Sequence, residues 1–192
     1  KDLEKDESIG IIGAGPAGLA AAEELRKRGY QIDIYDRHDR SGGLLIYGIP
    51  NFKLEKKIVQ RRIKYLKDSG IKFHLNVNIG HDISFQDLRK KHKAVLIATG
   101  VYKAKELNIN NNFNNSVPAL DYLVASNRKG LGDKVESFDN GLLNAEGKNV
   151  IVIGGGDTAM DCVRTAIRQK TSSVKCLYRR DRVNMPGSAR EV

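Results

Sequence analysis

The sequence has few cysteines and no long apolar run, and both absences exclude classes of protein. Cys162 and Cys176 are the only two cysteines in 192 residues. Two are too few for a disulfide-rich secreted domain, or for a zinc or iron–sulfur site built from this chain's thiols alone. No stretch approaches the ~18 apolar residues of a membrane-spanning helix, and the first residues lack the apolar core of a signal peptide. We therefore expect a cytoplasmic protein with no membrane partner, whose cysteines are small buried side chains.

Positive charge is in excess, with 33 Lys and Arg against 23 Asp and Glu and a formal net charge of +10. The excess gathers between residues 53 and 67, where apolar side chains recur at helical spacing. That pattern predicts an amphipathic helix with a solvated, charged outer face. Aromatic residues do not alternate with these charges, as a platform for single-stranded nucleic acid would require. We therefore expect no nucleic-acid partner.

The organisation of the chain is dominated by one structural unit that occurs twice. Residues 8–13, 16–28 and 30–36 are typical of a strand, a helix and a strand, the βαβ unit of a parallel sheet. The same succession returns at residues 150–153, 157–169 and 174–178. An offset of 141 residues carries one glycine pattern onto the other: Gly13, Gly15 and Gly18 onto Gly154, Gly156 and Ala159. The predicted fold class is therefore α/β, with two Rossmann-like units.

The first glycine pattern, Gly13-Ala14-Gly15-Pro16-Ala17-Gly18, lies between a predicted strand and a predicted helix. Gly13 permits the tight turn, Gly15 lets the backbone approach a pyrophosphate, and Gly18 lets helix and strand pack closely. The helix N-terminus offers amide N–H groups and partial positive charge to the phosphates. Asp36 ends the second strand, where a carboxylate accepts hydrogen bonds from both hydroxyls of an adenosine ribose. This loop predicts a dinucleotide with an unphosphorylated ribose.

The second pattern is Gly154-Gly155-Gly156-Asp157-Thr158-Ala159, in which Ala159 replaces the third glycine of the first pattern. The strand that follows its helix also ends differently. Its second strand leads to Arg179 and Arg180 instead of a carboxylate. Guanidinium groups bind a 2′-phosphate through paired, charge-assisted hydrogen bonds, whereas a carboxylate repels it. The second loop therefore predicts NADP; the alternative is two surface arginines without a ligand.

Two dinucleotides on one chain have a chemical logic. A nicotinamide delivers hydride, and a flavin accepts it and releases electrons singly. The protein then needs no acid, base or nucleophile, so we predict FAD and NADPH as cofactors, with no catalytic side chain and no metal site. A disulfide reductase of the same architecture would need a redox-active Cys-x-x-Cys, which the sequence lacks.

Three stretches resemble one known family: residues 42–54 (Gly-Gly-Leu-Leu-Ile-Tyr-Gly-Ile-Pro-Asn-Phe-Lys-Leu), residues 154–166, and residues 178–188. They are similar to the small (beta) subunits of NADPH-dependent glutamate synthases. The wider group includes the flavin half of dihydropyrimidine dehydrogenase and adrenodoxin reductase-like enzymes. The resemblance implies that FAD is held by Gly13, Ala14, Gly15, Ala17, Gly18, Asp36, Gly43, Leu44, Val77, Ala98, Thr99 and Gly100. It implies that NADPH is held by Gly154, Gly156, Asp157, Thr158, Arg179, Arg180 and Glu191.

The resemblance also implies an activity and a partner. The enzyme would take hydride from NADPH to FAD and pass electrons to a large (alpha) subunit that forms glutamate from glutamine and 2-oxoglutarate. The family's iron–sulfur clusters have no ligands in this chain. We expect a fragment, with an FAD-binding domain at 1–118, a linker at 119–148 and a truncated NADPH-binding domain at 149–192, inactive by itself in glutamate formation. The alternatives are a non-catalytic nucleotide-binding remnant and another NAD(P)H-dependent flavin reductase.

Overall fold

The computed structural model describes residues 4–102 and 115–191, which divide into two compact units. Among the described residues, the first unit comprises 4–46 and 54–102, and the second comprises 47–53 and 115–191. The chain therefore enters the second unit at Tyr47, returns to the first after Lys53, and leaves it again after Tyr102. We call the excursion Tyr47–Lys53 the strap.

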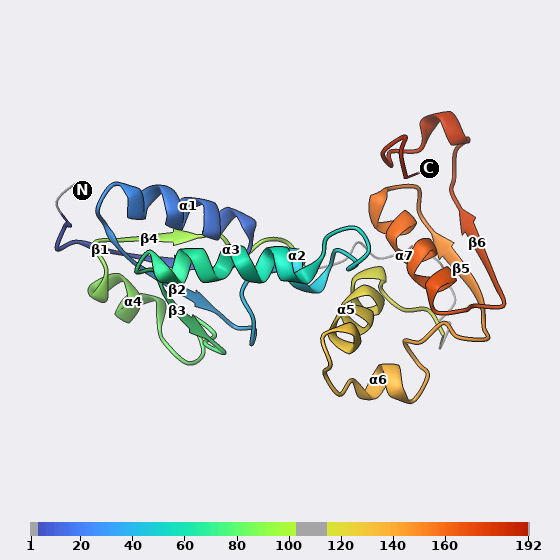
Figure 1. The fold of residues 1–192 in the computed structure, drawn as a ribbon, viewed down its shortest axis with the longest axis horizontal. Coiled ribbons are helices and arrows are strands. Elements are labelled where there is room, and N and C mark those ends of the chain that lie inside the picture. Colours follow the sequence, from blue (N-terminus) through green and yellow to red (C-terminus); the bar gives the residue numbers. More distant parts are fainter. Residues whose placement is uncertain (1–3, 103–114, 192) are drawn as a thin grey trace. The chain divides into compact units, whose positions relative to one another are not determined.

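The first unit is built on a parallel four-stranded sheet (Figure 1). Its strands are β1 (Ser8–Ile12), β2 (Gln31–Asp36), β3 (Lys72–Leu75) and β4 (Ala94–Ile97), in the order β3-β2-β1-β4. The connecting helices are α1 (Pro16–Lys27), α2 (Leu44–Tyr47), α3 (Lys56–Asp68) and α4 (Phe85–Lys91). The strand order reverses direction beside β1, and such a switch point opens a crevice at the carboxyl ends of the strands.

The core of the first unit follows from the apolar patterns of its elements. β1 and β2 are buried along most of their length, as central parallel strands are. The helices contribute apolar residues at helical spacing, so each buries one face. The fully or nearly buried side chains include Ile11, Leu19, Ala22, Ile32, Ile34, Val59, Ile63 and Leu66.

One lysine departs from the expected solvated face of α3. Lys56 is only 6% exposed, and its Nζ donates a hydrogen bond to the carbonyl oxygen of Leu45 at 3.0 Å. Burial lowers the pKa of Lys56 to about 8. Lys56 therefore belongs to the packing between α3 and α2, and the charged face begins at Lys57.

The second unit contains the second βαβ arrangement and additional helices. The strands β5 (Asn149–Ile153) and β6 (Ser173–Leu177) pair in parallel, connected by α7 (Asp157–Arg168). The helices α5 (Ala119–Gly130) and α6 (Glu136–Asp139) precede them, and the short 3-10 helix η1 (Arg182–Asn184) follows. α5 lies within the stretch predicted as a linker, and it packs on α7.

The predicted elements of both βαβ units are confirmed to within one residue at each end. The expectation of two buried cysteines is half wrong. Cys162 is buried on α7, which raises the pKa of its thiol to about 12, whereas Cys176 on β6 is exposed. Among the described residues, β6 packs against β5 and α7, and four of its five residues are exposed.

A buried polar network joins β2 to α4. The Tyr35 hydroxyl lies 3.0 Å from His92 Nε2 and accepts a hydrogen bond from Lys91 Nζ at 2.8 Å. The Tyr35 ring stacks on His74 at 4.6 Å, and His74 in turn bonds Asp33. Tyr35 and His92 are 1% and 4% exposed, so nearly every polar group here needs a protein partner.

This network predicts that the first unit loses stability as pH falls. Burial lowers the pKa of His92 below its ordinary 6.5, with smaller effects from Asp33, Lys91 and His74. The unfolded chain therefore binds a proton at His92 more readily than the folded chain. The stability linked to His92 is fully present above pH 6.5 and is lost as pH falls from there, with a slope of at most about 1.4 kcal/mol per pH unit.

The measurement is the free energy of urea unfolding between pH 5 and 7.5. His92→Gln should remove part of this pH dependence while lowering stability at neutral pH. His81→Gln is the control, because the His81 side chain is 82% exposed. An unchanged pH slope in His92→Gln would show that His92 does not carry the effect.

Candidate functional site

At the first glycine loop, backbone segments approach too closely for side chains. A Cβ on Gly13 would lie 2.3 Å from the Ala98 carbonyl oxygen, and a Cβ on Gly18 would lie 2.0 Å from the Gly13 carbonyl oxygen. Gly13 has a φ of +110°, which side chains rarely allow. Its N–H donates to Tyr35 O at 2.8 Å, so the loop is tied to β2. Packing therefore requires glycine at both positions.

Gly15 is different, because packing does not require it. A Cβ there would meet nothing within 4 Å, and its φ of −76° suits any residue. Gly15 is the N-cap of α1, and no described side chain caps that helix. The first-turn amides are therefore available to another acceptor. Gly43 approaches Gly15 closely, since a Cβ on Gly43 would lie 2.9 Å from the Gly15 Cα.

Asp36 organises the opposite side of the loop. Its carboxylate is 9% exposed, with Oδ2 accepting from Ala14 N at 2.7 Å and Oδ1 accepting from His38 N at 2.9 Å. Its carbonyl accepts from Val77 N at 2.9 Å. His38 Nδ1 also lies 2.8 Å from Oδ1. A carboxylate has about four lone-pair sites, so acceptor capacity remains after these three contacts. Asp36 thus brings Ala14 and Val77 to one place.

The structure gathers most of the residues predicted for FAD at the carboxyl ends of β1, β2 and β4. Those in mutual contact are Gly13, Ala14, Gly15, Gly18, Asp36, Gly43, Val77 and Ala98. Ala17 and Leu44 are exposed at the starts of α1 and α2, and Thr99 and Gly100 are exposed after β4. The binding role of each residue stays a prediction.

Tyr102 is a residue that sequence reasoning missed. Its hydroxyl lies 3.8 Å from the position of a Cβ on Gly43, and its ring is beside His38 and under the Arg37 guanidinium. Burial and the charge of Asp36 raise the pKa of Tyr102. No motif marks this tyrosine; only its position after Gly100, at the end of the β4 loop, could have suggested it.

The second loop repeats the first in its backbone bonding. Gly154 N donates to Leu177 O at 2.9 Å, as Gly13 N does to Tyr35 O. The register pairs Ile153 with Leu177, so the next residue, Tyr178, takes the place that Asp36 has in the first unit. Arg179 and Arg180 follow, both exposed and with no acidic partner among the described residues.

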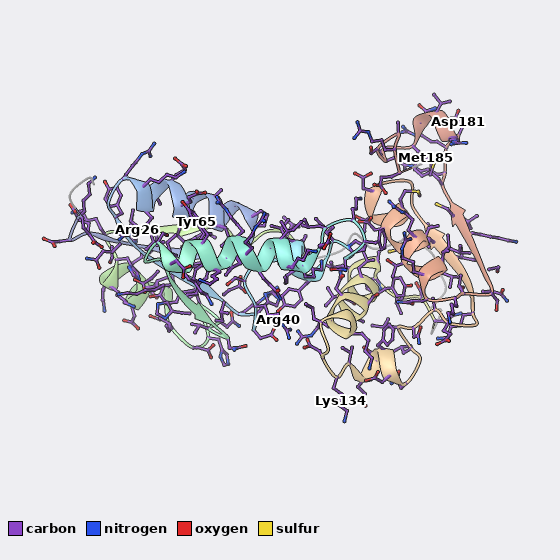
Figure 2. The ribbon with its side chains drawn as sticks, in the orientation of Figure 1. Arg26, Arg40, Tyr65, Lys134, Asp181 and Met185 are labelled. Carbon is purple, nitrogen blue, oxygen red and sulfur yellow. The ribbon has the colours of Figure 1, made fainter. Side chains whose placement is uncertain are left out.

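The second loop differs in what covers it. A Cβ on Gly155 would lie 2.7 Å from the Tyr178 ring, so Gly155, which the sequence analysis gave no role, is required by that ring. Gly187 N donates to Gly155 O at 2.9 Å, and Ser188 N donates to Asp157 Oδ1 at 2.8 Å. The segment 181–189, in which Figure 2 labels Asp181 and Met185, also lines a cavity of about 370 Å³. The lining residues are Arg182, Val183, Met185, Gly187 and Ala189.

The other residues predicted for NADPH divide between two environments. Gly156 is the N-cap of α7, and Thr158 is exposed on its first turn. Glu191 is ion-paired with Arg164 and lies 3.6 Å from Lys53 Nζ. Glu191 is therefore part of a charge cluster along α7. The binding roles of these residues also stay predictions.

The chain belongs to the pyridine nucleotide-disulphide oxidoreductase family, whose model matches residues 7–192. Within it, the chain is 64% identical over 186 residues to the glutamate synthase [NADPH] small chain of Azospirillum brasilense, covering 96% of this chain and 39% of the relative. It is 46% identical to the small chain of Escherichia coli, again covering 97% of this chain and 39% of the relative. The predicted resemblance is confirmed, and the chain spans about two fifths of these relatives' length.

Solved structures confirm the fold class. Mycobacterium tuberculosis FprA in complex with NADPH matches 97% of this chain and 46% of its own, with a TM-score of 0.78 and 20% identity. Lactococcus lactis thioredoxin reductase matches 97% of this chain and 60% of its own, with a TM-score of 0.63 and 19% identity. At these identities the likeness is one of fold.

Two further findings concern the described residues alone. None of their helices is long and apolar enough to cross a membrane. No group of three or more His, Cys, Asp or Glu side chains among them is arranged to hold a metal ion.

The contrast between Gly18 and Gly15 predicts that one added methyl group has a large effect on stability at Gly18 and a small effect at Gly15. Gly18→Ala should destabilise the protein by about 2–3 kcal/mol or more, because its Cβ meets a backbone oxygen that cannot move aside. Gly15→Ala should change stability by less than about 1 kcal/mol, since the space is open and the backbone unstrained. Urea unfolding of the two variants measures the difference. Equal losses would show that Gly15 is also a packing glycine.

Proposed function

We propose that this chain is the electron-input part of a cytoplasmic, NADPH-dependent glutamate synthase. The observation that carries the proposal is a difference between two equivalent loops. After the same βαβ arrangement, one loop faces the buried carboxylate of Asp36, and the other is followed by the exposed guanidinium groups of Arg179 and Arg180. A carboxylate suits the ribose of FAD, and paired guanidinium groups suit the 2′-phosphate of NADPH.

The residues of the first loop fit FAD. The open space beside Gly15 and the uncapped first turn of α1 suit a pyrophosphate, which needs close backbone approach and amide donors. Asp36 retains acceptor sites for ribose hydroxyls while Ala14 and His38 hold it in place. Lys56 fixes α2 through Leu45, and we assign Tyr102 to the same site as an additional contact.

The residues of the second loop fit NADPH. Gly156 begins α7 without a side-chain cap, and Arg179 and Arg180 lie next to the end of β6. Bound NADPH would supply hydride donation and bound FAD hydride acceptance, so the chain would contribute no reacting side chain. The residues of the first loop would hold FAD, and those of the second loop would hold NADPH.

We further propose that the electrons leave toward a large (alpha) subunit that forms glutamate from glutamine and 2-oxoglutarate. The name of the 64% identical relative, a small chain, supports such a partner. Iron–sulfur clusters would be needed along that route, and the described residues contain no ligand set for one. The free thiols of Cys162 and Cys176 support a reducing, cytoplasmic compartment.

FAD retention tests the first site. Gly15→Val should fold but lose bound flavin, because its side chain fills the space needed by the pyrophosphate. Flavin absorbance per mole of purified protein, together with the unfolding midpoint, measures both properties. Arg179→Ala is the matched control and should retain FAD. A folded Gly15→Val protein with full flavin content would refute the assignment, and flavin-free parent protein would favour a non-catalytic remnant.

Nucleotide preference tests the second site. Arg179→Ala should weaken NADPH binding about tenfold or more, since a charge-assisted hydrogen bond contributes about 1.5–3 kcal/mol. NADH binding should change little, because NADH has no 2′-phosphate. Titration of the FAD-loaded protein with each nucleotide gives the two dissociation constants. Equal weakening for both nucleotides would indicate a packing defect at the loop instead.

A further inference from the structure

The second unit has an exposed segment after β6 that returns to the unit's own glycine loop. We call residues 179–191 the return segment; it begins with Arg179 and Arg180 and includes η1. Figure 1 shows the chain passing from β6 through η1 and back to α7. Most residues of the segment are exposed, so apolar burial contributes little to its position. Polar contacts therefore determine where Arg179 and Arg180 lie.

The beginning of the return segment is held by Tyr178. The Tyr178 ring packs on the glycine loop, since a Cβ on Gly155 would lie 2.7 Å from a ring carbon. The Tyr178 hydroxyl donates to Asn184 O at 3.1 Å. Asp181, the N-cap of η1, accepts from Asn184 N at 3.0 Å. The chain between Tyr178 and Asp181, which contains both arginines, is therefore closed into a short loop at Asn184.

The middle of the return segment is tied to the second glycine loop. Gly187 N donates to Gly155 O at 2.9 Å, and Ser188 N donates to Asp157 Oδ1 at 2.8 Å. Asp157 is the first residue of α7. An ionised carboxylate only accepts hydrogen bonds, and so do the phosphate oxygens of a dinucleotide, so Asp157 cannot bond a pyrophosphate directly. Its acceptor oxygen is used to hold the return segment instead.

The end of the return segment is held by a charge cluster on α7. Glu191 is ion-paired with Arg164 and lies 3.6 Å from Lys53 Nζ. Lys53 Nζ also lies 3.0 Å from Asp161 Oδ1, and Asp161 is only 7% exposed. A buried carboxylate without a counter-charge is costly, so the position of Lys53 is tightly constrained. Glu191 is therefore attached to a fixed point of the second unit.

The strap, which supplies this lysine, is itself held by helices of the second unit. The Asn127 side-chain amide donates to Tyr47 O at 2.8 Å and to Gly48 O at 3.2 Å. The Arg168 guanidinium lies 3.7 Å from the centroid of the Phe52 ring. The return segment is thus attached at its beginning, in its middle and at its end, and all these contacts lie within the second unit.

We propose that Tyr178 and Asp157 are positioning residues that hold Arg179 and Arg180 in place for the 2′-phosphate of NADPH. The inference rests on the proposed function. Binding a phosphate requires exposed arginine side chains to become ordered, and a backbone that is already held reduces what must be ordered. Tyr178 and Asp157 act through the return segment and need not touch the nucleotide. Because NADPH and NADH differ only in the 2′-phosphate, both residues affect the preference between them.

The experiment uses the FAD-loaded protein and compares single variants. Asp157→Ala removes the acceptor of Ser188 N, and Asp157→Asn keeps an oxygen acceptor without the charge. Tyr178→Phe removes the hydroxyl and keeps the ring. The matched control is Asp121→Ala, because Asp121 is likewise an exposed acidic residue in the first turn of a helix, α5.

Two readouts are taken: hydrogen exchange of the backbone amides between residues 184 and 188 without nucleotide, and the dissociation constants of NADPH and NADH. Asp157→Ala should speed this exchange and weaken NADPH binding about three- to tenfold, because a solvent-exposed hydrogen bond to a charged acceptor is lost. Tyr178→Phe should also speed exchange and weaken NADPH binding, about two- to fivefold. NADH binding should stay within about twofold in both variants. Asp157→Asn should retain the preference for NADPH, since its amide oxygen still accepts from Ser188 N, and Asp121→Ala should behave as the parent.

A second background tests whether Asp157 acts through the two arginines. In the Arg179→Ala/Arg180→Ala protein, adding Asp157→Ala should not weaken NADPH binding further, because no guanidinium group is left there to be positioned. A direct contact between Asp157 and the nucleotide would persist in this background. A further loss of NADPH affinity would therefore overturn the positioning role.

Three other results would overturn the inference alone. Unchanged amide exchange in Asp157→Ala would show that Asp157 does not anchor the return segment. Faster exchange with an unchanged NADPH dissociation constant, in either variant, would show that the anchored segment does not position the arginines. Equal weakening for NADPH and NADH would show that the effect does not pass through the 2′-phosphate. A parent protein without preference for NADPH would instead overturn the proposed function of the second loop and the positioning role with it, while the exchange data would still report whether the segment is anchored.

Discussion

The contact between Gly18 and the carbonyl of Gly13 is the constraint on which the first unit depends. Because neither residue has a side chain, α1 starts directly against the end of β1, and the Ala98 carbonyl closes on Gly13 from β4. Three backbone segments therefore meet where the strand order reverses. The space beside Gly15 stays open, since a Cβ there would meet nothing within 4 Å. The same packing that stabilises the unit thus creates the exposed helix N-terminus.

The second unit uses the same turn with a looser contact. Ala159 replaces the third glycine, and a Cβ on Gly154 would lie 3.3 Å from the Ala159 Cβ, a tight contact but not an impossible one. The close approach moves to Gly155, which the Tyr178 ring covers. Because an aromatic ring stands where the first unit has Asp36, the negative charge is absent. The next residues, Arg179 and Arg180, are the ones that we propose for recognition of the ribose end.

Local patterns predicted the strands, helices and loops of both βαβ units because each signal is contained in a few neighbouring residues. The strap was not predicted, since its partners Asn127, Asp161 and Arg168 are far away in the sequence. Lys56 was expected on a charged face for the same reason: nothing near it in sequence shows that Leu45 will offer a carbonyl. Tyr102 likewise acquires its environment from Gly43 and Asp36. Long-range polar contacts have no period, so periodicity cannot reveal them.

The two candidate sites differ in how far their recognition groups are pre-organised. Asp36 is held by Ala14 and His38, so its carboxylate is already oriented by hydrogen bonds within the chain. Arg179 and Arg180 are exposed, and ordering their side chains would accompany binding of a phosphate. A permanently bound flavin matches the first arrangement, and a nucleotide that must enter and leave matches the second. The structural difference between the two loops therefore agrees with the proposed electron transfer, in which FAD stays bound and the nicotinamide nucleotide is exchanged.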